Sequence, residues 1–312
     1  MQSRVRWAYL CDLRLETTGE NKYKTAADIF RSQLNSHPRT AQGQFWHKLK
    51  YPNQGQAYSD QGSILSRWHY AYVGWLDGIY MGEVFYADYT KKFQPGNTTA
   101  WGVLVFIVLL HVWTWFLSAL ADITQQFTLM FQNTIQNATA PNNTGLLYHG
   151  YDFSHRTVWA SPDRGHSPEV WDRALGWYSM ALVDILEIFP RDNPGYQNIL
   201  TILRTLVPRI RDVAEPVSGV WWLVITQPGR AKNYFESSGS AMFVYAMLKA
   251  LRLGYVQDTA DGSILRAARK AYDYMIQNWV VQNSDGTMNW LNTVNVSSAW
   301  VYKLLLHLLH LV

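Results

Sequence analysis

Side chains that could bind a flat ring with a negative charge gather in the middle of this 312-residue sequence. Arg173 and Trp177 are four residues apart, so they share one face of the helix that we expect from Ser167 onward. Trp171 adds a second indole, and His149 lies in the preceding segment. A guanidinium pairs with a carboxylate and an indole covers the face of a ring, so this pattern fits a ring that carries a carboxylate. A packed core is the alternative, because tryptophan is usually a core residue.

The helix that must position Arg173 has clear start signals. Ser167 can cap its N-terminus, Pro168 suits its first turn, and Glu169 favours the positive end of the helix dipole. Apolar residues then recur at helical spacing as far as Phe189. We therefore expect one amphipathic helix between Ser167 and Phe189.

The same order of turn, helix and aromatic segment recurs along the chain, and this repeat predicts a helical hairpin as the unit. In each unit a turn precedes an amphipathic helix, a polar turn with a glycine closes it, and an aromatic-rich segment follows. The glycines of the closing turns are Gly43, Gly145, Gly219 and Gly286. Strand-like alternation is scarce, so we expect an all-α fold.

The spacing of these glycines indicates two insertions. The two later intervals are 74 and 67 residues, whereas the first is 102. A polar stretch of 19 residues at 55–73 and an apolar stretch of 20 at 102–121 stand out in the long interval. Without them the interval falls to 63 residues, and retained non-coding segments are the favoured explanation.

The apolar segment 102–121 leaves two other interpretations open. Its length suits a transmembrane helix, and a buried helix fits equally well. Its flanks carry no strong asymmetry of Lys and Arg, so we expect no membrane partner. Residues 297–312 form an apolar tail that also departs from the repeats. We interpret 1–312 as one domain with two insertions and an atypical tail.

Composition restricts the classes of protein that the chain can belong to. A hydrophobic content of 48% allows a large core. The net charge of +4 is spread out without a basic run, which argues against nucleic acid and is compatible with an acidic small substrate. Cys11 is the only cysteine, so no intrachain disulfide or cysteine zinc site is possible. The first residues lack the apolar core of a signal peptide, and both secretion and the cytoplasm stay open.

Several motifs resemble the unsaturated rhamnogalacturonyl hydrolases of glycoside hydrolase family 105, which is related to family 88. In chain order, the matching segments are Gly43–Lys48, Trp75–Gly82, His149–Asp152, Trp171–Trp177 and Asn233–Met242. The resemblance covers most of the chain from about Thr18 to Val296, with interruptions at the two insertions. It implies an (α/α)6 toroid of helical hairpins, which agrees with the repeat. The chain is short for six hairpins, so we expect the toroid to be incomplete at both ends.

The resemblance also implies a reaction, the degradation of pectin fragments. The C4–C5 double bond of an unsaturated galacturonic acid is hydrated at the non-reducing end of rhamnogalacturonan, and the neighbouring rhamnose is released. One carboxyl that begins protonated can serve this reaction, unlike a two-carboxylate displacement. By resemblance that group is Asp77, and apolar neighbours such as Trp75 and Ile79 would raise the pKa of an aspartate there. A simple turn or helix-start cap is the alternative for Asp77.

The remaining site residues also follow from the resemblance. His47 and His149 are expected to line the site, Arg173 to pair with the sugar, and Trp171 and Trp177 to form pocket walls. The partner is then an unsaturated uronic-acid oligosaccharide. No metal or other cofactor is expected, since the sequence holds no metal constellation and no nucleotide loop.

The sequence also gives predictions for Asp152, for Glu236 and for the first residues of the chain. Asp152 is expected to close the turn after His149, and Glu236 either reaches the cavity or caps a helix that begins at Ser237. The family's second aspartate has no counterpart here, because Met1–Arg4 stand in its place.

Three other functions stay open. One is an unsaturated glucuronyl hydrolase that acts on glycosaminoglycan fragments. Another is an inactive or carbohydrate-binding relative, in which the two insertions prevent the toroid from closing. A third is a membrane-anchored protein held by 102–121.

Overall fold

The computed structural model describes residues 14–46, 73–95, 97, 105–109, 112–116, 118–140, 142–157 and 159–294. Its helices are α2 (Asn21–Asn35), α3 (Leu76–Phe93), α5 (Ala119–Thr134), α6 (Asp172–Ile188), α7 (Pro194–Asp212), α8 (Ser237–Arg252) and α9 (Ser263–Trp279). The strands are β1 (Val73–Trp75), β2 (Val105–Leu109), β3 (Val112–Phe116), β4 (Gly150–Asp152), β5 (Val280–Gln282) and β6 (Met288–Trp290).

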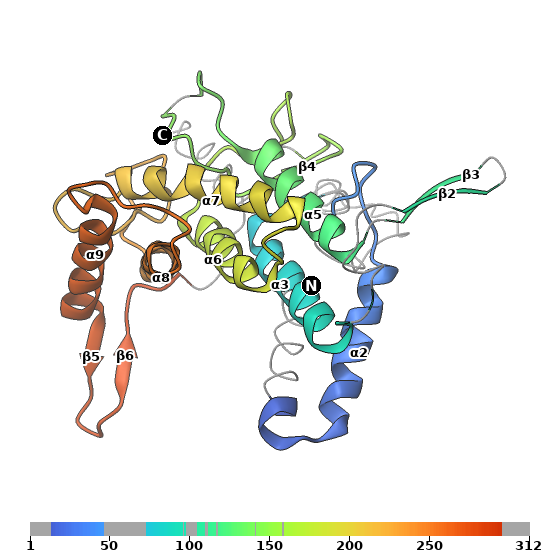
Figure 1. Cartoon of the computed structure of the whole chain (residues 1–312). Helices are drawn as coiled ribbons and strands as arrows, with labels where there is room; N and C mark the ends of the chain where they lie inside the picture. Colours follow the sequence, from blue (N-terminus) through green and yellow to red (C-terminus); the bar gives the residue numbers. More distant parts are fainter. Residues whose placement is uncertain are drawn as a thin grey trace, which may run out of the picture.

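The helices from α3 to α9 form two layers (Figure 1). Helices α3, α6 and α8 lie side by side in one layer, and α5, α7 and α9 form the other. The chain alternates between the layers, so each successive pair is a helical hairpin. This alternation confirms the all-α repeat predicted from the sequence. The four closing glycines share one backbone conformation, with positive φ angles of 94°, 66°, 79° and 82°.

The two layers differ in how their helices are buried, and the sequence explains the difference. Helix α9 buries one stripe at intervals of three or four residues, which comprises Ile264, Ala268, Ala271, Met275 and Trp279. Helix α6 is buried on several faces, because neighbours lie on both sides of it and α7 covers it. Small residues permit this close packing, since a Cβ at Gly176 would lie 2.9 Å from Met242 of α8.

The predicted helix start at Ser167 is wrong, because α6 begins at Asp172. The intervening residues are not helical, and they bond to distant backbone. Ser167 N–H donates to the carbonyl of Gly150 over 2.8 Å, and Ile225 N–H donates to the carbonyl of Val170 over 3.0 Å. These long-range bonds replace the helical bonds that the capping residues could have started.

Strands β1 and β4 pair antiparallel and fix the start of α3. Trp75 lies opposite Gly150 in this pairing. A Cβ at Gly150 would be 2.4 Å from the carbonyl oxygen of Gly74, so only glycine allows the strands to approach this closely. The pairing therefore brings the first turn of α3 beside the residue before β4, which is His149.

The segment 102–121 is not a single helix, because its described residues 105–109 and 112–116 are strands. Strands β2 and β3 pair as an antiparallel hairpin that projects from the helices (Figure 1). Its last residues begin α5, whose N-terminus is capped by Ser118, because the Ser118 side chain accepts from Ala121 N–H over 3.2 Å. Both helical interpretations of this segment are therefore wrong for residues 105–109 and 112–116. Segment 55–73 lies outside the described residues except for Val73, and the interpretation of both segments as insertions stays a prediction.

Candidate active site

A carboxylate and an imidazole meet where α3 begins. His149 Nε2 lies 3.2 Å from Asp77 Oδ2, and both side chains are only 8% exposed. Leu76 N–H also donates to the backbone carbonyl of His149 over 3.1 Å, so the backbone and the side chains hold the two segments together. Asp77 lies in the first turn of α3.

Two indoles enclose the imidazole of His149. The ring centroid of Trp75 lies 4.4 Å from that of His149, and Trp171 approaches from another side at 4.6 Å. Both tryptophans are buried, and Trp159 packs against Trp75 at 5.4 Å. The aromatic rings keep water away from His149 and limit the directions in which its ring nitrogens can act.

Helix α6 carries the other expected sugar-binding side chains. Trp177 packs on Tyr80 of α3, with ring centroids 5.0 Å apart. Arg173 donates from Nε to Ser238 Oγ over 2.6 Å and from Nη2 to Glu236 Oε1 over 3.1 Å. Glu236 also caps α8, since its carboxylate accepts from Gly239 N–H over 2.7 Å. Glu236 is therefore the cap of α8, which is one of the two roles that the sequence left open. Its pairing with Arg173 was not predicted.

The structure brings together most of the residues that the sequence analysis selected. Asp77, His149 and Trp171 form one contact chain, and Arg173 and Trp177 follow on the helix that Trp171 precedes. His47 lies outside the described residues.

Asp152 has the structural role that was expected. One carboxylate oxygen accepts from the N–H and the hydroxyl of Ser154, and the other accepts from the N–H groups of Arg156 and Thr157. These bonds shape the loop after β4.

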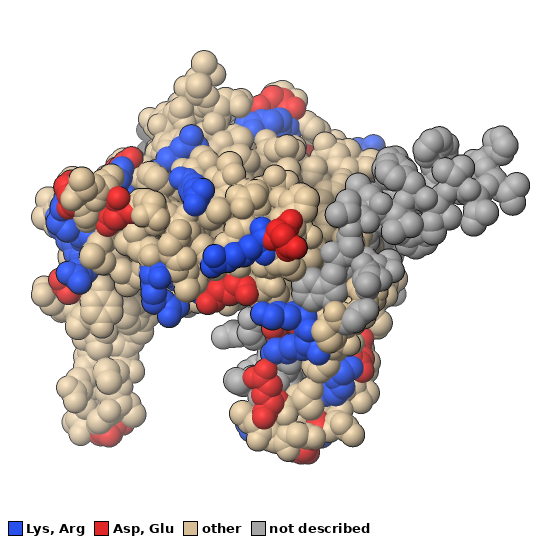
Figure 2. Space-filling model, in the orientation of Figure 1, with Lys and Arg blue, Asp and Glu red and all other residues tan. Residues whose placement is uncertain are grey.

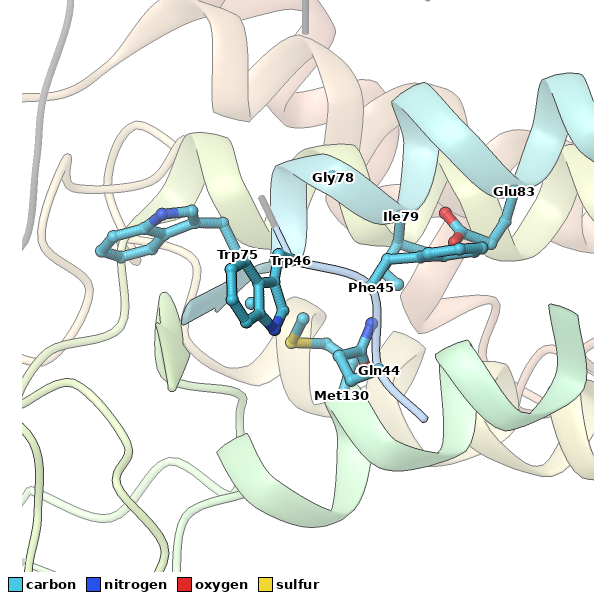
Figure 3. A pocket seen from close by; sticks show the side chains of 9 residues that line it. Gln44, Phe45, Trp46, Trp75, Gly78, Ile79, Glu83 and Met130 are labelled. Atoms are coloured by element: carbon cyan, nitrogen blue, oxygen red, sulfur yellow. The ribbon is translucent and has the colours of Figure 1, made fainter. Parts of the chain in front are cut away.

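A pocket opens beside the first turns of α3 (Figure 3). Its empty volume is about 250 Å³, including solvent at its mouth, and its lining comprises Gln44, Phe45, Trp46, Gly74, Trp75, Gly78, Ile79, Glu83 and Met130. Trp75 and Gly78 lie two residues before and one residue after Asp77, so the pocket lies beside the first turn of α3, and Asp77 itself is not among the residues that line it. Trp46 directly precedes His47 in sequence. His47 is the one predicted site residue that lies outside the described part of the chain.

Glu83 is a polar group of this pocket that the sequence analysis missed. It is 2% exposed, and its Oε2 has no hydrogen-bond partner within the described part of the chain. Burial, reinforced by the charge of Asp122, raises the pKa of Glu83 well above its usual value. Burial thus favours the protonated form of Glu83. The available signal was an acidic residue within the apolar run of α3.

A buried polar network anchors the pocket wall to α5. Arg39 donates to both carboxylate oxygens of Asp122, over 2.6 and 2.7 Å. Gln126 Oε1 accepts from Gln44 Nε2 over 2.7 Å and from Phe45 N–H over 2.9 Å. The network thereby fixes the segment that leads to Trp46.

Charged side chains of both signs are mixed on the surface (Figure 2). Figure 2 shows Lys and Arg scattered over one face of the molecule, where acidic side chains lie among them. Among the described residues, no group of three or more His, Cys, Asp or Glu could hold a metal ion. No helix in the same part of the chain is long and apolar enough to cross a membrane.

Comparison with known proteins places this geometry in a family. Residues 7–303 match the model of Glycosyl Hydrolase Family 88. The chain belongs to glycosyl hydrolase family 88. This family 88 chain is 37% identical over 153 residues to Protein Atu3128 of Agrobacterium fabrum, in a match that covers 49% of this chain and 65% of that protein. It thus spans less than two thirds of the length of this curated relative.

Solved structures support the same assignment for this family 88 chain. A glycoside hydrolase from family 105 of C. acetobutylicum is 33% identical, with a TM-score of 0.72 over 93% of this chain and 67% of that one. An unsaturated glucuronyl hydrolase from Streptococcus agalactiae shares the fold at 12% identity, with a TM-score of 0.59 over 95% of this chain and 63% of that one. The expected relation to families 105 and 88 and the all-α hairpin fold are confirmed.

Proposed function

We propose that this chain hydrates the C4–C5 double bond of an unsaturated galacturonic acid at the non-reducing end of rhamnogalacturonan fragments. The observation that carries the proposal is the buried Asp77–His149 pair between Trp75 and Trp171, with Arg173 on the adjoining helix. The likeness to a family 105 enzyme at 33% identity supports the galacturonyl substrate.

In the proposed reaction Asp77 acts first as an acid and then as a base. Its carboxyl proton forms the new bond to C4, and the electrons of the double bond move to make that bond. Positive charge then develops at C5 and is shared with the ring oxygen. A water molecule attacks C5 and returns a proton to the Asp77 carboxylate, so the group ends as it began. The hydrated ring opens to a ketone and releases the rhamnose.

The neighbours of Asp77 support this cycle. His149 lies 3.2 Å from Oδ2, so it can hold the carboxyl in one orientation while the other oxygen faces the sugar. The indoles around His149 keep bulk water out, which strengthens this polar contact. Charge at C5 develops beside the substrate carboxylate, and Arg173 is proposed to bind that carboxylate.

The test is the loss of ultraviolet absorbance of the conjugated double bond in two purified disaccharides. We expect faster loss with unsaturated galacturonyl-rhamnose than with an unsaturated glucuronyl disaccharide from a glycosaminoglycan. The reverse order would favour the glucuronyl hydrolase. Loss of neither substrate would favour an inactive or carbohydrate-binding relative.

A saturated control substrate and a chain without the two insertions make this test more specific. The saturated galacturonyl-rhamnose disaccharide has no double bond and is expected to stay intact, whereas a two-carboxylate glycosidase would cleave it. The same assays on a chain without 55–73 and 102–121 test the insertions. If these segments interrupt the site, their removal raises the rate.

A further inference from the structure

The guanidinium of Arg173 is held by the N-terminus of the neighbouring helix α8. Its Nε donates to Ser238 Oγ, and its Nη2 donates to Glu236 Oε1 and to the carbonyl of Val294. The Arg173 side chain is 14% exposed and that of Glu236 is wholly buried. A buried, charge-assisted contact of this kind restricts the arginine to one orientation.

Glu236 is itself fixed by several donors, so it offers Arg173 a rigid partner. Gly239 N–H donates to Oε2 over 2.7 Å, and Val294 N–H donates to Oε1 over 3.1 Å. Ser238 Oγ lies 2.9 Å from Oε1 and joins Glu236 to Arg173 by a second route. Burial acts to raise the pKa of Glu236, but hydrogen bonds from Gly239, Asp172 and Val294 outweigh it. The charge of Arg173 adds to them, and the pKa lies below its usual value.

The adjacent Asp172 is a second carboxyl group near Arg173. It is wholly buried, and its Oδ1 accepts from the N–H of Arg173 over 2.7 Å. Its Oδ2 lies where a Cβ of Gly239 would approach to 2.4 Å, and the carboxyl groups of Asp172 and Glu236 share a hydrogen bond. Burial, followed by the charge of Glu236, raises the pKa of Asp172 well above its usual value. Glu236 is therefore the carboxylate that contacts the guanidinium of Arg173.

We propose that Glu236, together with Ser238, is a positioning residue that orients Arg173 toward the carboxylate of the sugar. This inference rests on the proposed function, because it assigns Arg173 to a uronate. The positioning comes from a helix adjacent to the one that carries Arg173, and the two residues are 63 apart in sequence. Recognition of the substrate charge then depends on the contact between α6 and α8.

The experiment compares unsaturated galacturonyl-rhamnose with its methyl ester, which keeps the double bond and lacks the charge. The measured quantity is the ratio of kcat/KM for the acid to kcat/KM for the ester. In Glu236→Gln the amide oxygen can still accept from Gly239 N–H, whereas the amide nitrogen cannot accept from Arg173. We expect the ratio to fall about tenfold, the scale of one charge-assisted hydrogen bond. Glu236→Asp keeps the charge and is expected to recover part of the ratio.

A purely structural role for Glu236 would give a different result. The rates for acid and ester would then fall together, and an unchanged ratio in Glu236→Gln would overturn the inference. Asn193→Ala is the matched control, since Asn193 caps α7 by accepting from Gly195 N–H over 2.9 Å. It removes a helix cap in the other layer, and its ratio is expected to equal that of the wild type.

Two further outcomes are distinguishable. If the wild-type protein degrades neither substrate, the proposed function is wrong and the inference falls with it. If the wild type is active and Glu236→Gln does not fold, Ser238→Ala removes the hydroxyl that accepts from Arg173 Nε. A lower ratio in this variant supports the positioning role, and an unchanged ratio overturns it.

Discussion

Replacement of Gly150 by alanine tests whether the pairing of β1 with β4 builds the site. The new Cβ would lie 2.4 Å from Gly74 O and 2.7 Å from Trp75 Cε3. The first contact involves backbone, so the strands must separate by about 0.6 Å to reach the 3.0 Å limit of real contacts. The Asp77–His149 distance of 3.2 Å would lengthen to as much as about 3.8 Å, which is beyond hydrogen-bond range.

This displacement predicts two measurable effects. Overpacking of the strands costs about 1–3 kcal/mol of unfolding free energy, measured as a lower urea midpoint at unchanged slope. Misplacement of the carboxyl lowers kcat/KM in the ultraviolet assay on the order of 100-fold. Gly78→Ala is a control for stability, because a Cβ there meets nothing within 4 Å and alanine favours a helix by about 0.5 kcal/mol. Full stability and activity in Gly150→Ala would refute the argument that this strand contact positions Asp77.

Two further predictions concern the buried carboxyl groups around the pocket. Glu83 has a raised pKa in the folded protein. Above about pH 4.3 the unfolded chain loses the proton of this group while the native state still keeps it. The contribution of Glu83 to the free energy of unfolding therefore falls as the pH rises. Glu83→Gln is therefore expected to gain stability relative to the wild type as the pH rises above about 4.3, by at most about 1.4 kcal/mol per pH unit, and parallel stability curves would contradict the raised pKa. Arg39→Ala leaves Asp122 buried without its cation and is expected to cost about 3 kcal/mol in urea unfolding, whereas a loss below about 1 kcal/mol would mean that Gln126 alone satisfies Asp122.

The repeated helical hairpin could be predicted because its signals are local. Apolar spacing and a closing glycine recur in each unit, and each of the four glycines adopts a positive φ. The start of α6 could not be predicted in this way. Ser167, Pro168 and Glu169 are good helix-start residues, but backbone bonds to Gly150 and Ile225 hold this segment outside the helix. Long-range pairing outweighed the local preference.

The candidate site shows the same limit. A resemblance selected Asp77 and His149, which are 72 residues apart, but their direct contact depends on the pairing of β1 with β4. The partner of Arg173 was missed for a similar reason, because Glu236 comes from the start of another helix. Glu83 was missed because no local pattern distinguishes a buried acidic residue from an exposed one.

The most direct test of the account is the rate at which Asp77→Asn removes the ultraviolet absorbance of unsaturated galacturonyl-rhamnose. Asparagine keeps the size of the side chain and can neither give a proton to C4 nor take one from water. We expect the rate to fall by about 10²–10⁴-fold relative to the wild type while the urea midpoint changes little. A variant that retains the wild-type rate would contradict the assignment of Asp77 as the acid and base of this reaction.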